Sequence, residues 1–565
     1  MNKRTVTRLK TWALMVWVFL AVIPQGSGAV KPEIPVDVLG RLILQDGGRK
    51  KPFDTYAREN LVKLTGRAKW ISPEGQRWSA IEVMTDLALG TNNWLGEKII
   101  RIGFIPLKER LGLDVSEKFF SYHDIRSQGE VSSKLMGILN PRDGSTPDSK
   151  LTAEARKLVG QLNQLENLTG AEAFAWVPVG GGGRWLHVED APQAYSERGS
   201  DILLAYKAMQ QAYRQGNVPE FQKQARAFRS QLESLGGPEL YPSGRMKMEL
   251  IYNYVHPFRW AWIVLLVSFA LLLIPETGSP QRSGLRCTYC IGMSLFGTAI
   301  LLQIFGFVLR TLISGRAPVT NMYEVLIFMA LGASVIAYIF TIMYRQKMLV
   351  QAAAVVAALT LILADNLPAV FDPGIQPLVP VLQSNWWLTV HVITITIGYA
   401  AFLLAMGVGH IAMARYLFFP TDKKTIDNLT RFNYHTMQLG VLFLAAGTLL
   451  GGLWAEKAWG RFWGWDTKET WALIALLLYL AVLHARYVRW IGGFGLNAAS
   501  VLAFQGIVMA GYGVNYLLGT GKHSYGFGVG GELVVGIFVL LELILVLLAV
   551  IRHRQVIKQS KGTQS

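Results

Sequence analysis

The chain has few cysteines and few charged residues for its length. Only two of its 565 residues are cysteines, Cys287 and Cys290, which excludes a fold held together by disulfides. Their spacing is that of a redox pair, but no strand pattern flanks them and no second pair completes a zinc site, so we interpret both as incidental. Charged residues make up 16% of the chain and hydrophobic ones 51%, which indicates a protein largely embedded in a membrane.

Acidic residues are the scarcer charged kind. The chain has 55 Lys and Arg against 38 Asp and Glu, a net charge of +17. An excess of this size can serve nucleic-acid binding, but the basic residues do not gather into one patch interleaved with aromatics. They are spread over short loops between apolar runs, as membrane topology requires. We therefore predict no nucleic-acid partner.

The first 29 residues have the layout of a secretory signal. Basic residues precede an apolar run from Trp12 to Ile23, and the small residues Ser27-Gly28-Ala29 follow it. The run is short for a membrane span, so cleavage after Ala29 is favoured, and retention of residues 1–29 as an N-terminal anchor is the alternative. In either case the next segment is exported.

Residues 30–255 contain no apolar run long enough to cross a bilayer. Between Asp201 and Leu235 apolar residues recur at helical spacing, and Gly216 with Pro219 marks a break. This pattern predicts a helical hairpin. We expect residues 30–255 to form a helix-rich, exported soluble domain.

Residues 256–555 contain a series of apolar segments, each about long enough to span a membrane. They lie near 259–275, 288–309, 323–344, 349–367, 386–414, 434–453, 471–490, 498–518 and 531–551. If the first apolar segment enters the membrane from the outer side, most Lys and Arg residues of the loops lie on the inner side, as the positive-inside rule requires. The predicted fold is thus an all-α polytopic membrane protein of about nine transmembrane helices, with residues 556–565 as a cytoplasmic tail.

One loop between two of these segments, residues 454–471, is unusually rich in tryptophan. Its sequence is WAEKAWGRFWGWDTKETW, with tryptophans at Trp454, Trp459, Trp463, Trp465 and Trp471. A belt at the membrane interface explains one or two of these residues but not the whole arrangement. A platform for a flat, apolar and partly charged ligand is the alternative that we favour.

WGRFWGWDTKETW resembles the tryptophan-rich WWD signature of heme-handling membrane proteins. From about residue 255 to 555 the chain resembles the CcsA (ResC) family, a subunit of System II cytochrome c synthases. The family's usual tryptophan pair is Phe462-Trp463 here, which keeps an aromatic face. LQDGGRKKPFDTYAREN, residues 44–60, is more weakly similar to extended CcsA-type proteins and to fusions of CcsA with ResB.

The resemblance implies a role in cytochrome c biogenesis at the bacterial inner membrane. The bound substrate would be heme b, which is attached through thioether bonds to the CxxCH motifs of apocytochrome c. The implied partners are apocytochrome c, a ResB/CcsB-type membrane subunit and a thioredoxin-like protein that reduces thiols. Residues 30–255 and the tryptophan loop would lie on the periplasmic side.

Two histidines are predicted to lie on the outer face beside the tryptophan loop. His391 is near the outer end of the fifth apolar segment, and His523 follows the eighth. A lone histidine near the end of a span is usually a packed or interfacial residue, but two on one face beside an aromatic platform favour a heme site, because imidazole is a natural axial ligand of heme iron. The resemblance assigns both as ligands of an external heme.

His484 is predicted to lie near the inner face of the membrane, away from His391. It lies thirteen residues past Trp471, about 20 Å deeper along a helix, and cannot share an iron with His391. The resemblance implies a second heme within the membrane, whose other ligand comes from the ResB-type subunit. His410 and His435 lie near the inner ends of their segments and are the alternative partners within this chain.

Charged residues near the tryptophan loop and before the third segment allow two interpretations. GRAPVTNMYE, residues 315–324, resembles a family motif, and Arg316 can either pair with a heme propionate or hold its loop against neighbours such as Glu324. Likewise Asp466, with Lys468 and Glu469, can bind propionates or assist proton transfer, or can cap the following helix.

No activated nucleophile is predicted on the outer face, which lacks a cysteine and a Ser-His-Asp pattern. We therefore expect no catalytic residue beyond those that position heme. Two other functions stay open: a heme exporter or chaperone without ligase activity, as in the CcmC branch, which is shorter and lacks a large exported domain, and a non-heme transporter or scaffold.

Overall fold

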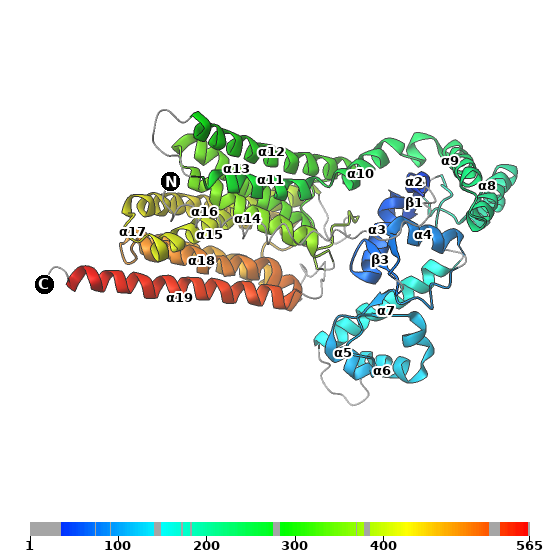
Figure 1. Cartoon of the computed structure of the whole chain (residues 1–565), viewed down its shortest axis with the longest axis horizontal. Helices are drawn as coiled ribbons and strands as arrows, with labels where there is room; N and C mark the ends of the chain where they lie inside the picture. The colour runs from blue at the N-terminus through cyan, green and yellow to red at the C-terminus, as the bar shows by residue number, and fades with distance from the viewer. Residues whose placement is uncertain are drawn as a thin grey trace.

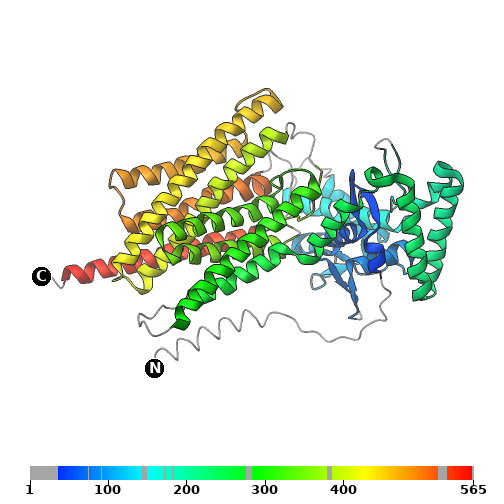
Figure 2. The same cartoon turned by 90° about the horizontal axis from the view of Figure 1, so that it is seen from above.

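The computed structural model describes residues 36–73, 75–90, 92–140, 149–170, 173–180, 183–274, 283–368, 370–377, 385–518 and 531–562. The predicted signal, residues 1–29, and His523 lie outside the described residues. The described residues form two large hydrophobic cores, one between Leu39 and Met246 and the other between Phe258 and Ile507. Figure 1 shows the two parts end to end, and Figure 2 shows the same arrangement from above.

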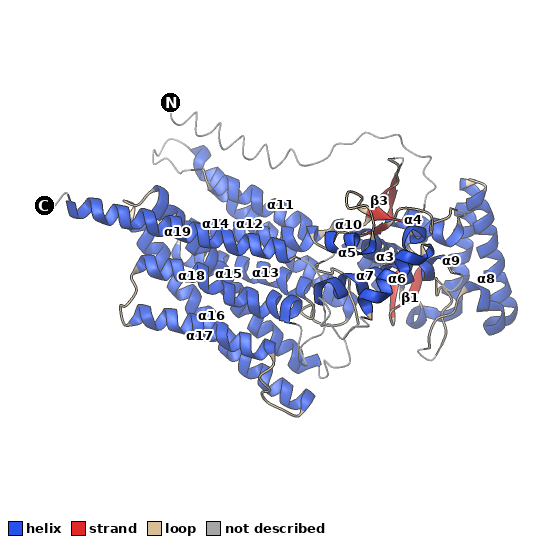
Figure 3. Cartoon of the chain, turned by 90° about the horizontal axis from the view of Figure 1, so that it is seen from below, coloured by secondary structure: helices blue, strands red, loops and turns tan. Residues whose placement is uncertain are grey.

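The N-terminal domain, residues 36–242, is mostly helical, and the strands drawn in Figure 3 belong to it. Its helices are α2 (Asp37–Gly40), α3 (Phe53–Thr65), α4 (Ala80–Leu89), α5 (Ile105–Leu111), α6 (Gly129–Leu139), α7 (Ser149–Thr169), α8 (Ala191–Arg214) and α9 (Val218–Leu240). Antiparallel pairs join β1 (Ile43–Asp46) to β2 (Arg49–Pro52), β3 (Lys69–Ile71) to β4 (Arg77–Ser79), and β5 (Ile100–Arg101) to β6 (Phe119–Phe120).

The predicted helical hairpin is confirmed. Helices α8 and α9 pack against each other, and Gly216 between them has a φ of 66°, a left-handed conformation that glycine adopts without strain. The β1–β2 turn also depends on glycine, because Gly47 and Gly48 both have positive φ, as a tight hairpin turn requires.

The second part is a bundle of long apolar helices. Among the described residues nine helical segments are long and apolar enough to cross a membrane, which confirms the predicted fold class. The first combines α10 (Ser243–Val255) and α11 (Pro257–Leu272); the others are α12 (Ser283–Ser314), α13 (Met322–Tyr344), α14 (Lys347–Asn366), α15 (Asn385–Phe418), α16 (Lys423–Trp459), α17 (Thr467–Tyr487), α18 (Gly493–Val508) with the π-helical η3 (Met509–Leu518), and α19 (Glu532–Gly562). Helix α19 continues past residue 555, where we predicted a separate tail.

Helix α15 lies in the middle of this bundle and packs most extensively on α16. The two helices run antiparallel, and glycines of α16 face large side chains of α15 in one register: Gly440 faces Phe402, Gly447 faces Ile395 and Gly451 faces His391. A methyl group on Gly447 would lie 2.7 Å from the Cα atom of Ile395. Only glycine allows this close approach between membrane helices.

Candidate functional site

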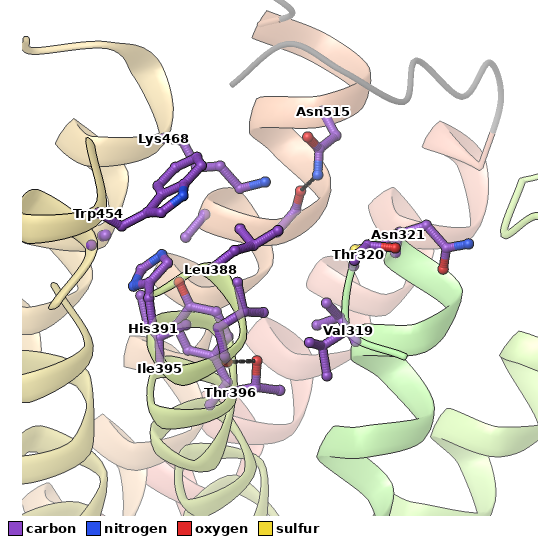
Figure 4. Close-up of a pocket in the computed structure, with 18 of the residues that line it drawn as sticks. Val319, Thr320, Asn321, Leu388, His391, Ile395, Thr396, Trp454, Lys468 and Asn515 are labelled. Atoms are coloured by element: carbon purple, nitrogen blue, oxygen red, sulfur yellow. Dashed lines mark hydrogen bonds between the residues drawn. The ribbon is translucent and has the colours of Figure 1, made fainter. Parts of the chain in front are cut away.

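A cavity of about 450 Å³ lies within the bundle, at the end where α13, α15 and α17 begin. Its walls come from the start of α13, from α15, α16 and α17, from η3, and from residues 370–377 after α14. In Figure 4 His391, Trp454 and Lys468 lie on one side of the cavity, and Val319, Thr320 and Asn321 lie on the other. The cavity thus has an aromatic wall and a more polar one.

His391 has the geometry of a metal-binding histidine. Its Nδ1 lies 2.7 Å from the carbonyl oxygen of Gly447. A carbonyl can only accept a hydrogen bond, so Nδ1 carries the proton and the lone pair of the neutral ring is on Nε2. Histidines that bind metals commonly donate their other nitrogen in this way, which fixes both the tautomer and the ring orientation.

The imidazole of His391 is stacked on an indole of the tryptophan-rich stretch. The ring of Trp454 is nearly parallel to it, with 5° between the planes and 6.2 Å between the centroids. Trp454 is only 1% exposed and is held in turn by Trp459, whose ring meets it edge-on at 4.7 Å. The predicted partnership of His391 with this stretch is therefore present in the structure.

The loop itself is shorter than the predicted 454–471. Helix α16 continues to Trp459 and α17 begins at Thr467, so only residues 460–466 are non-helical. The prediction was wrong because it placed the ends of the helices where hydrophobicity falls, whereas the backbone continues through polar turns until Gly460, with a φ of 69°, ends α16.

The tryptophans do not all face the cavity. Trp454 and Trp463 line it together with Phe462. Trp465 is 68% exposed and meets Trp463 edge-to-face at 5.7 Å, and Trp471 lies on α17 outside the lining residues. The exposed position of Trp465 fits the interfacial alternative.

Asp466 and Glu469 form a capping box at the start of α17. Oδ1 of Asp466 accepts hydrogen bonds from the backbone nitrogens of Lys468 at 3.1 Å and Glu469 at 3.0 Å. The Glu469 carboxylate accepts from the backbone nitrogens of Gly464 at 2.7 Å and Asp466 at 3.3 Å and from Arg461 at 3.0 Å. These bonds bear out the capping alternative for both residues, while Lys468 reaches the cavity wall.

Arg316 also lines the cavity, but its guanidinium is already bound to protein. Nη2 donates to the carbonyl oxygen of Gln376 at 2.9 Å, and Nη1 lies 3.3 Å from Oε2 of Glu324. The other oxygen of Glu324 accepts from Arg310 at 2.9 Å, and both Glu324 and Arg310 are fully buried. The alternative that these residues hold the loop in place is therefore borne out, and the propionate role of Arg316 stays a prediction.

The three other histidines that the sequence analysis considered as ligands differ in their surroundings. His484 is exposed on α17, and its Nδ1 donates to the Leu480 carbonyl at 2.7 Å, which puts the lone pair on Nε2. His410 uses both ring nitrogens, with the Met406 carbonyl at 2.8 Å and the Glu542 carboxylate at 2.7 Å. His435 is exposed and contacts Gln438. The bonds of His410 argue against it as a second ligand beside His484.

Several residues of the cavity were not predicted from the sequence. Among them are Leu388, Tyr399, Asn515, the wall residues Asp372 and Gln376, and Gly451 beside His391. A sequence signal existed only for Gly451, which continues a row of glycines at helical spacing in α16. The others meet only through the tertiary fold.

Comparison with known proteins agrees with this geometry. A family model described as cytochrome C assembly protein matches residues 319–520, a range that includes His391, the tryptophans and η3. The cytochrome c biogenesis protein CcsA of Prochlorococcus marinus (strain NATL2A) is 30% identical over 305 residues, which cover 47% of this chain and 92% of that protein. The chain belongs to the CcsA family of cytochrome c biogenesis proteins. CcsA of Chlorella vulgaris is 32% identical, covering 42% of this chain and 86% of that protein.

A longer relative matches more of the chain than these CcsA proteins do. Protein NrfI of Wolinella succinogenes is 30% identical over 517 residues, which cover 86% of this chain. The chain spans about half the length of NrfI, because the match covers 54% of that protein. The similarity therefore extends beyond the part that this chain shares with CcsA.

Proposed function

We propose that this member of the CcsA family binds heme b in the cavity and presents it for covalent attachment to apocytochrome c. The observation that carries the proposal is His391, whose proton is fixed on Nδ1 by Gly447 and whose ring is stacked on Trp454. This arrangement orients a nitrogen ligand beside an aromatic surface, as an axial histidine of heme requires.

The residues of the cavity fit a porphyrin. Apolar and aromatic side chains such as Leu388, Ile395 and Trp463 would contact the ring, and polar groups such as Asn321 and Asn515 would meet charged substituents. The proposed second ligand, His523, follows Tyr516 by seven residues, and Tyr516 lines the cavity.

The reaction needs positioning more than a catalytic group. A thioether forms when the sulfur of a cysteine thiol bonds to one carbon of a heme vinyl group and the thiol proton is added to the other carbon, so no oxidant or reductant is consumed. The protein would hold the vinyl groups where the thiols of a CxxCH segment arrive. Positioning of this kind contributes about 7–11 kcal/mol to lowering a barrier.

His484 supports a second step in the proposal. Its exposed position on α17, with the lone pair on Nε2, suits a heme shared with another membrane subunit. We propose a ResB-type subunit as that partner, with this chain acting as the synthase subunit. The bacterial inner membrane, with the cavity and the N-terminal domain on the periplasmic side, is the proposed location, and a thioredoxin-like protein would keep the substrate thiols reduced.

Absorption spectroscopy tests the proposal. Protein purified from heme-replete cells should show a Soret band and α/β bands, and co-expression with a ResB-type subunit and an apocytochrome should give covalent heme on gels stained for heme. His123→Ala is the control, because this histidine is exposed in the N-terminal domain and lies outside the cavity. Bound heme without covalent product favours the exporter or chaperone alternative, and colourless protein favours a non-heme function.

A further inference from the structure

One wall of the cavity is formed by a short segment after α14, residues 370–377, which we call the strap. Val370, Asp372, Gln376 and Pro377 of the strap line the cavity. The strap has no regular secondary structure, so its position depends on the groups that hold it. Those groups come from both parts of the molecule.

On the side of the bundle the strap is held by its carbonyl oxygens and by two buried side chains, Phe371 and Ile375. Arg310 donates to the carbonyl of Pro373 at 2.8 Å, and Arg316 donates to that of Gln376 at 2.9 Å. Ile375 is buried in an apolar cluster with Leu309 and Ile313 of α12 and with Met248 and Tyr252 of α10. These contacts fix the strap along most of its length.

On the other side the strap meets the N-terminal domain at Glu59. A methyl group on Gly374 would lie 3.3 Å from Oε1 of this carboxylate. Burial raises the pKa of Glu59, the carboxylate of Asp372 in the strap raises it further, and Lys51 and Arg49 lower it. The two carboxylates are thus near enough to repel each other across the contact.

Glu59 is held firmly by its own domain. Lys51, which is 1% exposed, donates to it at 2.6 Å, and Arg49 lies 3.6 Å away. Arg49 also makes two hydrogen bonds, of 2.7 and 2.9 Å, to Glu249 of α10. Glu59, Lys51 and Arg49 all belong to segment 44–60.

A second contact ties the same segment to α10. Asn253 donates to Asp54 at 3.1 Å and to Thr55 at 2.9 Å. Segment 44–60 is therefore bonded to α10 and also lies against the strap. This is the segment whose role the proposed function leaves unexplained.

We propose that segment 44–60 sets how tightly the cavity retains its ligand, with Glu59 as the positioning residue that backs the strap at Gly374 from the side of the N-terminal domain. The identity of the ligand as heme rests on the proposed function, but the contact itself does not. The N-terminal domain is then a structural part of the binding site. Loosening the contact at Glu59 frees the wall of the cavity without touching His391.

The test compares Glu59→Ala, Gly374→Ala and the double variant in the full-length protein. Glu59→Ala leaves Lys51 paired with Asp46 at 2.8 Å, so the domain keeps a partner for its buried lysine. The release of heme to excess apomyoglobin should be on the order of five- to tenfold faster in Glu59→Ala, a modest coupling between sites. The ligand-dependent bands of the bound heme should not change, because His391 is intact.

The effects of Glu59→Ala and Gly374→Ala on the rate of heme release should not be additive in the double variant. A methyl group on Gly374 would lie 2.9 Å from Oδ1 of Asp372, 3.1 Å from Nε2 of Gln376 and 3.3 Å from Oε1 of Glu59, so the part of its effect that comes from Glu59 should be absent from the double variant. Glu117→Ala is the matched control, because it breaks an exposed ion pair with Lys98 elsewhere in the same domain. Asn253→Ala tests the second contact without disturbing a buried charge.

Hydrogen exchange separates this inference from the proposed function. Amides of residues 370–377 should exchange faster in Glu59→Ala than in Glu117→Ala whether or not heme is bound. Wild-type protein without heme would refute the proposed function, and exchange would still test the contact. Unchanged exchange in the strap of Glu59→Ala, or heme release at the wild-type rate from heme-loaded Glu59→Ala, would overturn the inference.

Discussion

A methyl group on Gly451 would lie 2.6 Å from Cε1 and 2.8 Å from Nδ1 of His391. Both distances are far shorter than van der Waals contact, so the imidazole occupies space that only a glycine leaves open. The adjacent carbonyl of Gly447 takes the Nδ1 proton. Together the two glycines of α16 form a slot for one edge of the ring.

Gly451→Ala should displace His391 while leaving the helix intact, because alanine is the better helix former by about 1 kcal/mol. A shift of about 1 Å in a reacting group costs on the order of a hundredfold in rate. We expect a marked loss of heme content, measured by the heme-to-protein absorbance ratio.

Gly440→Ala is the control for this variant, since it crowds Phe402 in the same helix pair but not His391. In a His391→Ala background, Gly451→Ala should have no further effect on heme. Equal heme loss in both glycine variants would assign the result to general packing.

His391→Gly should open a coordination position in the bound heme that free imidazole refills. The same result is expected for His523→Gly if both residues are axial ligands of one iron. The measurement is the Soret maximum with and without imidazole. Unchanged iron spectra in both variants would rule out this ligand pair.

Trp454 and Trp465 differ most clearly in exposure, since Trp454 is buried and Trp465 is exposed. Trp454→Phe keeps an apolar ring but loses part of the indole surface that is stacked on His391, so heme retention should fall. Trp465→Ala changes an exposed side chain, and its effect on stability should be within about 0.5 kcal/mol. Heme content and thermal unfolding of the two proteins check this, and equal heme loss would contradict the placement of Trp465 outside the cavity.

Two substitutions of Asp466 distinguish a role in capping α17 from a direct chemical role of its carboxylate. Asp466→Ala removes the cap of α17, at a cost of about 1 kcal/mol, and should lower heme retention and cytochrome yield together. Asp466→Asn restores a good cap without the charge and should recover most of both. Normal heme content with low yield in the Asn variant would instead indicate a chemical role for the carboxylate.

His484→Ala should lower heme in the cavity as well as in the proposed membrane site, if heme passes from one to the other. His391→Ala should leave the membrane site loaded. Heme is quantified in each variant co-purified with a ResB-type subunit. Full occupancy of the cavity in His484→Ala would remove this histidine from the pathway.

The sequence predicted the bundle well because membrane spans are defined locally, by runs of apolar residues of sufficient length. It predicted the place of His391 for the same reason, since depth along a span follows from residue number. It missed the ends of α16 and α17, where hydrogen bonding carries each helix through polar turns. The contact between Glu59 and Gly374 could not be predicted, because it joins residues more than three hundred positions apart and no local pattern marks either one.

The register of α15 on α16 also has a consequence for the proposed exchange of heme ligands. Gly447 and Gly451 contact one edge of the His391 imidazole and Trp454 covers one of its faces, which limits how far the ring can turn away from a bound iron. A histidine brought in by the substrate would therefore have to take the opposite axial position. On this account the substrate enters on the side opposite His391, and His391 is the ligand that holds the heme until the finished cytochrome leaves with it.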